Sequence, residues 1–161
     1  MSFVRYKDFS VAPASLASNT GYRFWRLIVK GINDPQGLYA LIAEINLRET
    51  ASVDSPMEGI FTASTQYDGS FGPAAMADDE ALTGWCTAAG EWNNAYWQVR
   101  LPERREVQEI ALQAYNNGLG AGQMPKDFDI IASDNLADWF TILSVTNESN
   151  WAPGEIRTWS I

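Results

Sequence analysis

The chain has 161 residues, of which 12% are aromatic and seven are tryptophan, and this suits a single domain that buries a core of large, stiff side chains. Twenty Asp and Glu outnumber eleven Lys and Arg, and the net charge of −9 argues against nucleic acid or an anionic membrane surface as a partner. Residues 1–21 lack the pattern of a signal peptide, and no apolar run reaches the roughly 18 residues that membrane insertion requires. The single cysteine, Cys86, excludes a disulfide within the chain and is interpreted as a small buried thiol.

Alternating apolar and polar residues predict β-strands along most of the chain. Residues 1–20 show no clear period and are expected to form an arm or an extra edge strand. The expected strands, in chain order, cover residues 22–29, 39–47, 96–101, 107–115, 127–132, 138–145 and 155–161. Segments rich in Gly, Pro and Asn separate them, and a short helical turn is expected only at 73–81. The pattern predicts an all-β fold over residues 21–161, an antiparallel β-sandwich of the jelly-roll type.

The most informative segment runs from Met76 to Trp85 and combines an acidic turn with a hydroxyl and an aromatic residue. Calcium binds about six to eight oxygen atoms, drawn from carboxylates and backbone carbonyls. A curled loop can direct several carbonyls inward while Asp78 supplies charge and Thr83 supplies a hydroxyl. Trp85 would then anchor the loop to the core. Short acidic loops are common, so an ordinary solvated turn is the alternative.

This segment resembles the A-x-D-G-N-x-x-T-x-W loop of the discoidin family, also called the coagulation-factor type C domain, which has a galactose-binding-like fold. Asp78, Thr83 and Trp85 fall on the Asp, Thr and Trp of that pattern. Asp79 and Glu80 replace its Gly and Asn, and Asp tolerates the positive φ that the Gly position can require. Further similar segments follow in order at residues 63–65, 97–101 and 128–139.

The strand order differs from that of common family members, in which segments similar to 22–27 and 43–45 close the domain at its C-terminus. The resemblance therefore implies a circularly permuted chain, and permuted domains of this kind are associated with bacteriophage tail and adsorption proteins. In the family a Glu of the closing strand tends to complete a calcium shell, and Glu44 holds that position. The ligands that the resemblance implies for a structural calcium ion are Met76, Asp78, Glu80, Thr83 and Glu44.

Ligand contacts are expected in loops at one end of the sandwich, where the family binds its ligands. The candidates are Tyr67, Trp92, Asn93 and Asn116, because aromatic rings can stack on a sugar and amides can bind its hydroxyls. Sugar-binding members often use His and Arg there, and this chain has no histidine. The alternatives are ordinary turn residues or contacts to a neighbouring subunit of a homo-oligomer.

Catalysis is not expected. Without histidine the chain has no His general base and no His-activated nucleophile, and no glycine-rich phosphate loop is present. The acidic residues at 78–80 are adjacent in sequence, so their side chains diverge and do not face each other across a substrate. An enzyme is therefore not predicted.

Three functions remain open. The first is a calcium-stabilised, non-catalytic module on a phage virion, in the tail or a fibre, that recognises a cell-surface polysaccharide or glycan. The second is a structural virion subunit, in a tail, baseplate or capsid decoration, that contacts other virion proteins. The third is a bacterial accessory module. Loop aromatics exposed in a cleft would favour the first function, and their burial between subunits would favour the second.

Overall fold

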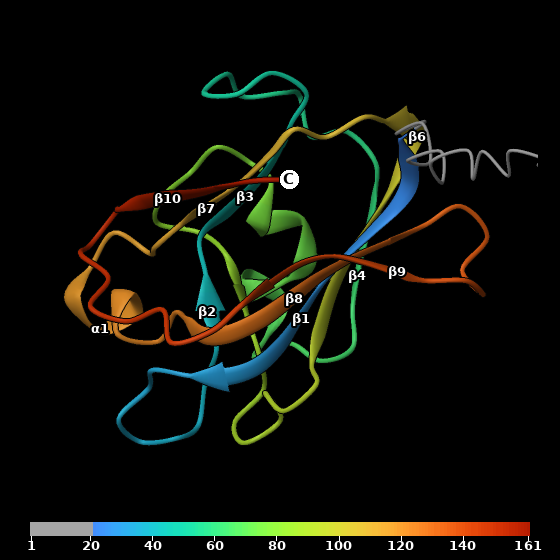
Figure 1. Ribbon diagram of the computed structural model, residues 1–161. Coiled ribbons are helices and arrows are strands. Elements are labelled where there is room, and N and C mark those ends of the chain that lie inside the picture. The colour runs from blue at the N-terminus through green and yellow to red at the C-terminus, as the bar shows by residue number, and fades with distance from the viewer. Residues whose placement is uncertain (1–20) are drawn as a thin grey trace, which may run out of the picture.

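Antiparallel β-strands dominate the described chain, residues 21–161, in this computed structural model (Figure 1). The expected arm at 1–20 lies outside the described residues. The strands are β1 (Tyr22–Ile32), β2 (Leu41–Ile42), β3 (Glu44–Arg48), β4 (Ile60–Ala63), β5 (Trp85–Cys86), β6 (Tyr96–Arg105), β7 (Glu109–Gln113), β8 (Pro125–Ser133), β9 (Phe140–Val145) and β10 (Ile156–Ser160). Two 3-10 helices, η1 (Gly69–Phe71) and η2 (Pro73–Met76), and one α-helical turn, α1 (Gly118–Ala121), complete the elements. Within residues 21–161 no helix has the length and apolarity needed to cross a bilayer.

The strands form two packed sheets and a small ribbon. The large sheet has the order β4-β6-β1-β8-β9, the small sheet has the order β10-β7-β3, and β2 pairs with β5. All of these pairings are antiparallel. The predicted antiparallel β-sandwich is confirmed.

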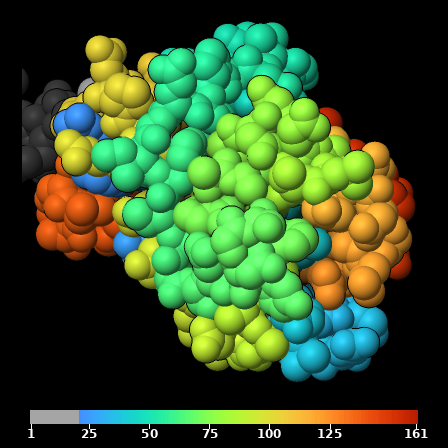
Figure 2. Space-filling view, turned by 180° about the vertical axis from the view of Figure 1, so that it is seen from behind, coloured from blue at the N-terminus to red at the C-terminus, as the bar shows by residue number. Residues whose placement is uncertain are grey.

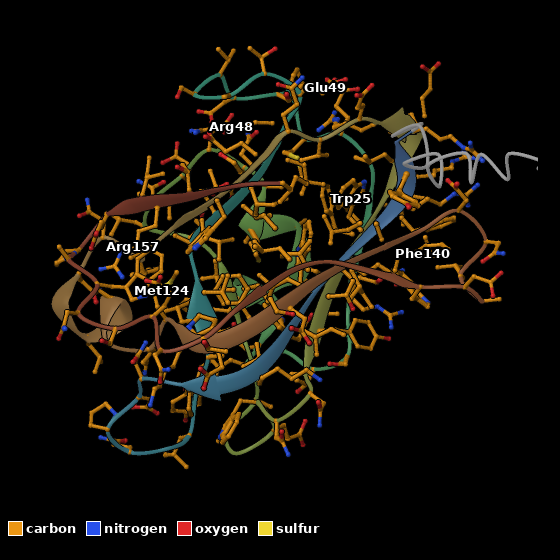
Figure 3. All side chains as sticks on the ribbon, viewed as in Figure 1. Trp25, Arg48, Glu49, Met124, Phe140 and Arg157 are labelled. Carbon is orange, nitrogen blue, oxygen red and sulfur yellow. The ribbon has the colours of Figure 1, made fainter. Side chains whose placement is uncertain are left out.

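The core lies between the two sheets because every second residue of their strands faces inward. Trp25 of β1, Trp97 of β6 and Phe128 of β8 enter it from the large sheet, and Figure 3 shows Trp25 on the inner side of its strand. Ile45 and Leu112 enter from the small sheet. The polar residues between these positions remain on the outer faces.

Two differences from the expected elements have a physical reason. The expected strand at 39–47 divides at Ala43, because β2 pairs with β5 while β3 pairs with β7. The chain thus crosses from the ribbon to the small sheet at that point. β4 and β5 were not predicted, since four and two residues are too few to display a period. Helix α1 was also missed, because its single turn depends on the cap of Asn117, whose side chain accepts the Gly120 N–H.

Both ends of the described chain contact the segment that connects β6 to β7. Gly21 has φ +68°, and its backbone lies so close to Arg105 that a side chain would clash there. The Ile161 N–H donates to the Gln108 carbonyl at 3.0 Å. Residues 106–108 join β6 to β7, so the beginning and the end of the sandwich both lie next to this short connection.

A buried ion pair joins β3 to β7. Nη1 of Arg48 lies 2.6 Å from Oε1 of Glu109, and both side chains are about nine-tenths buried. The Ser52 N–H donates to the same carboxylate at 3.0 Å. The Arg48 guanidinium, followed by the Ser52 N–H, lowers the pKa of Glu109. The pair therefore stabilises the fold only while Glu109 is ionised.

We expect Glu109→Gln to lower the free energy of unfolding by about 1–2 kcal/mol at neutral pH, because the amide keeps the shape but weakens charge-assisted hydrogen bonds. Since the folded pKa of Glu109 is depressed, its contribution is complete above the unfolded value of about 4.3 and is lost as the pH falls through the folded value. Urea unfolding at pH 7 and at about pH 3 should show the difference between the two proteins closing in acid. An equal difference at both pH values would contradict the assignment.

Candidate functional site

The acidic loop follows η2 and is held to the core at both ends. At its start the Met76 side chain is fully buried, and at its end the Trp85 indole N–H donates to the Thr65 carbonyl at 2.8 Å. A side chain at Gly84 would overlap the Ile42 carbonyl, so only glycine permits the loop to close against β2. Asp79 adopts φ +63°, the positive value expected at this position. The loop is therefore a tight, anchored turn.

Oxygen atoms of the acidic loop gather around the Thr83 hydroxyl, and Glu44 of β3 contacts the same loop at the Glu80 N–H. Oγ1 of Thr83 lies 2.8 Å and 3.0 Å from the two Asp78 carboxylate oxygens, and 2.8 Å from the Glu80 carbonyl. The Glu80 N–H lies 3.0 Å from Asp78 Oδ1 and 3.1 Å from Oε1 of Glu44. A hydroxyl has one hydrogen to donate, and here it faces three acceptor oxygens. The surplus of acceptors gives the cluster the donor chemistry of a hard cation site.

The electrostatics of this cluster centre on two carboxylates. Burial, and after it the hydrogen bond and negative charge of Asp78, raise the pKa of Glu44 to about 8. Within residues 21–161 no three Asp, Glu, His or Cys side chains converge as a metal site. A cation here would therefore depend on Asp78 and Glu44 for charge, and on Thr83, backbone carbonyls and water for the remaining oxygens. Since the Met76 side chain lies in the core, Met76 could contribute only its carbonyl.

An aromatic cleft lies beside β2 and β5. The Tyr67 ring packs edge-on against Tyr39 and Phe71, with ring centroids 5.6 Å and 6.0 Å apart. The cleft has a volume of about 210 Å³ and is lined by Tyr39, Leu41, Tyr67, Phe71, Cys86, Leu119 and Gln123. Figure 2 shows this side, where the green chain near residue 70 borders the blue-cyan loop near 35 and the orange chain near 120. Because the Tyr67 side chain is 53% exposed, an incoming molecule can contact its ring.

The cleft is preorganised and carries no positive charge. The Asp34 carboxylate accepts the backbone N–H groups of Leu38 and Tyr39 at 2.8 Å and 2.9 Å, and so fixes the loop that presents the Tyr39 ring. Of the lining residues, none has a charged side chain. Burial, followed by the negative charges of Asp34 and Asp68, raises the pKa of Cys86 to about 12, so this thiol stays protonated. The local field is therefore unfavourable to an anionic ligand.

The four predicted ligand residues fall in different places. Tyr67 lines the cleft. The Trp92 indole N–H donates to the Gly37 carbonyl at 3.1 Å, which ties its loop to the Tyr39 loop, and Asn93 is exposed beside it. Asn116 lies elsewhere, because its backbone N–H donates to the Ala81 carbonyl at 2.9 Å, next to the acidic loop.

Sequence reasoning did not identify Tyr39, Leu119 and Gln123 as lining residues. Tyr39 was included in an expected strand, and it comes to lie near Tyr67 only because β2 pairs with β5. Leu119 is 69% exposed on α1, and neither α1 nor that pairing gives a periodic signal in the sequence. The composition of the cleft could therefore not be read from any single segment.

A second depression, of about 350 Å³, lies on the outer face of the small sheet. Its lining includes Glu44 of the oxygen cluster and Asp79 of the acidic loop, and several of its other polar groups bind one another. Asn46 exchanges two hydrogen bonds with Ser55, and Arg48 binds Asp54 and Glu109. We therefore regard Asn46 and Arg48 as part of the structural framework, while Glu44 and Asp79 connect the depression to the acidic loop.

The comparisons with known proteins agree with this architecture. The family model described as F5/8 type C domain matches residues 60–161, which extend from β4 to the end of β10. No curated protein and no solved structure shows significant similarity to the chain.

Proposed function

The chain belongs to the F5/8 type C, or discoidin, family, whose domains are generally non-catalytic binding modules, and on this premise we propose that it recognises a neutral glycan through the aromatic cleft. The single observation that carries the proposal is the exposed ring of Tyr67 within a cleft formed with Tyr39 and Phe71. Sites for small ligands combine apolar and aromatic surface with a few placed polar groups. Here the two tyrosine hydroxyls and the Gln123 amide are the polar groups available for sugar hydroxyls.

The absence of positive charge from the cleft lining indicates which class of glycan the cleft can bind. Uronic, sialic and sulfated sugars carry anionic groups, which proteins usually bind with Arg or Lys. The lining residues within 21–161 include neither, and the nearby carboxylates of Asp34 and Asp68 repel anions. Uncharged hexose and N-acetylhexosamine polymers are therefore the proposed ligands.

A structural calcium ion at the acidic loop is the second part of the proposal. The donor set of Asp78, Glu44, Thr83 and the Glu80 carbonyl supports it, because Asp78 and the Glu80 carbonyl both contact the Thr83 hydroxyl and Glu44 accepts the Glu80 N–H of the same loop. The ion would join β3 to the loop that precedes β5. It would stabilise the folded chain and take no part in contacts with the glycan.

The proposal also includes a circularly permuted chain on a phage virion. The family match begins at β4, yet β1 lies at the centre of the large sheet and β3 pairs with β7, so the segment before the match supplies strands to both sheets. Permutation requires neighbouring ends, and residues 21 and 161 both contact the β6–β7 connection. The virion location is supported only by the resemblance of this strand order to phage tail and adsorption proteins.

An array of neutral and acidic polysaccharides tests the function. We expect the protein to bind members of the neutral set with dissociation constants of micromolar to millimolar order and to bind the acidic set at least about tenfold more weakly, because like charges near the cleft disfavour anions. The preference should diminish at high salt, which screens the carboxylates. Binding only to acidic polysaccharides would refute the proposed class, and a complete lack of glycan binding would favour a structural role in protein contacts.

A further inference from the structure

Four aromatic rings follow one another through the aromatic cleft and beyond it. The Tyr39 ring contacts the Tyr67 ring at a centroid separation of 5.6 Å, and Tyr67 contacts Phe71 at 6.0 Å. Phe71 in turn contacts Tyr115 at 6.2 Å, although Tyr115 does not line the cleft. Within residues 21–161 no ring contact joins two of these rings that are not neighbours in this order. The four rings therefore form an extended line, the aromatic row, and not a closed cluster.

Three separate connections of the fold supply the aromatic row. Tyr39 precedes β2, Tyr67 and Phe71 lie between β4 and β5, and Tyr115 follows β7. None of the four side chains is buried, and the most exposed of them, Tyr67, lies within the row. An incoming molecule can therefore contact several rings in succession.

Both ends of the aromatic row are held in place. At one end the Asp34 carboxylate accepts the backbone N–H of Tyr39 at 2.9 Å. At the other end the Tyr115 hydroxyl donates to the Leu82 carbonyl of the acidic loop. The Tyr115 ring also packs so closely against α1 that a side chain at Gly120 would overlap it. The row is therefore a preorganised surface, and such a surface loses little conformational freedom when it binds a ligand.

We propose that the aromatic row binds an internal stretch of a single neutral polysaccharide chain, with consecutive sugar units on consecutive rings. This inference rests on the proposed function and names the part of the glycan that the site recognises. The three ring separations are close to the length of one sugar unit in an extended chain. The cleft alone, at about 210 Å³, has room for little more than one such unit, whereas the row continues beyond it.

The orientation of the rings suits one soluble chain better than the flat face of a crystalline polysaccharide. The ring planes of Tyr39 and Tyr67 are inclined by 78°, and those of Tyr67 and Phe71 by 83°. A flat polymer surface would require coplanar rings. The units of a soluble chain can instead rotate about their linkages and so follow the turn from each ring to the next.

The affinity for fragments of increasing length tests the proposal. Fragments of one to six units, prepared from the neutral polysaccharide that binds best on the array, are titrated calorimetrically into the full chain. We expect four units to bind at least about tenfold more tightly than one unit, because each further ring adds contact surface, and we expect longer fragments to gain little more. In competition, a long and a short preparation of this polysaccharide should be equally effective at equal mass, since they contain the same amount of internal units. Competition in proportion to the number of chain ends would overturn the proposal.

Substitutions at the two ends of the aromatic row separate lost contacts from lost folding. Tyr39→Leu and Tyr115→Leu each remove one terminal ring, so each should weaken binding of the four-unit fragment at least about threefold. Binding of the two-unit fragment should not change, because two units can occupy the three rings that remain. A folding defect would instead weaken binding of every fragment. The matched control is Phe140→Leu, which removes an exposed ring on β9 outside the row and should bind every fragment like the wild type.

The outcomes distinguish this inference from the proposed function. Equal affinity for one and four units, or equal losses for short and long fragments in both end variants, would overturn binding along the row and leave glycan recognition by the cleft in place. Absence of binding to every neutral polysaccharide would overturn both.

Discussion

Calcium should raise the melting temperature of this protein, and a chelator should lower it again. At a calcium concentration of about one hundred times the dissociation constant, a single site found only in the folded state adds about 2.7 kcal/mol to the free energy of unfolding. For a domain of this size that corresponds to a shift of roughly 8 °C or more. The expected cause is the cluster of Asp78, Glu44, Thr83 and the Glu80 carbonyl, whose oxygens are the ligands that we propose for a hard divalent ion. Calorimetry with calcium, with EDTA and with calcium restored is the direct measurement.

The control variant lies in the same loop. Asp78→Asn removes the central carboxylate, and we expect it to eliminate the response to calcium. Asp79→Asn removes one negative charge from the next residue, tolerates the same positive φ and leaves the oxygens around Thr83 unchanged, so its response should persist. If both variants lose the response to calcium equally, the response depends on the total negative charge of the loop and not on a site at Asp78. No response to calcium in the wild type would remove the ion from the proposed function.

The sandwich could be predicted because its long strands alternate. β1, β6 and β8 each place an apolar residue at every second position for four residues or more, and this pattern depends on the chain alone. β4 and β5 were not predictable in this way, since their pairing with β6 and β2 defines them more than their own composition does. The alternation in the long strands thus predicts the layers of the fold. The short strands that position the cleft form only through tertiary pairing, so the sequence pattern does not predict them.

The two candidate sites differ in how far sequence predicts them. Asp78 and Thr83 are five residues apart, so a loop pattern can identify both, but the proximity of Glu44 was implied only by the resemblance to a family. The aromatic cleft depends still more on tertiary structure. Tyr39 and Tyr67 meet because Leu41 pairs with Cys86, and the Tyr67 N–H then donates to the Cys86 carbonyl at 2.8 Å. No local pattern in the sequence contains that information.

Tyr67→Ala should lower the affinity for the neutral polysaccharide selected on the array by about thirtyfold, because the loss of an aromatic anchor at the centre of a binding site costs about 2 kcal/mol. The Tyr67 ring is exposed in the cleft and contacts Tyr39 and Phe71 only at their edges, so its removal takes away contact surface while the core remains packed. The melting temperature should therefore change little. Isothermal titration of the wild type and the variant, with the same polysaccharide and at equal ionic strength, measures the difference.

Two further variants show which part of the side chain acts. Tyr67→Phe keeps the ring and loses the hydroxyl, so it should retain most of the affinity if stacking dominates; a loss equal to that of the alanine variant would assign the contribution to the hydroxyl. Ile60→Ala removes another exposed apolar side chain, on β4 and outside the cleft, and should bind like the wild type. If Ile60→Ala weakens binding as much as Tyr67→Ala does, the polysaccharide adheres to apolar surface in general. Unchanged affinity in Tyr67→Ala would contradict the proposed site, because the proposal depends on the exposed Tyr67 ring in the cleft.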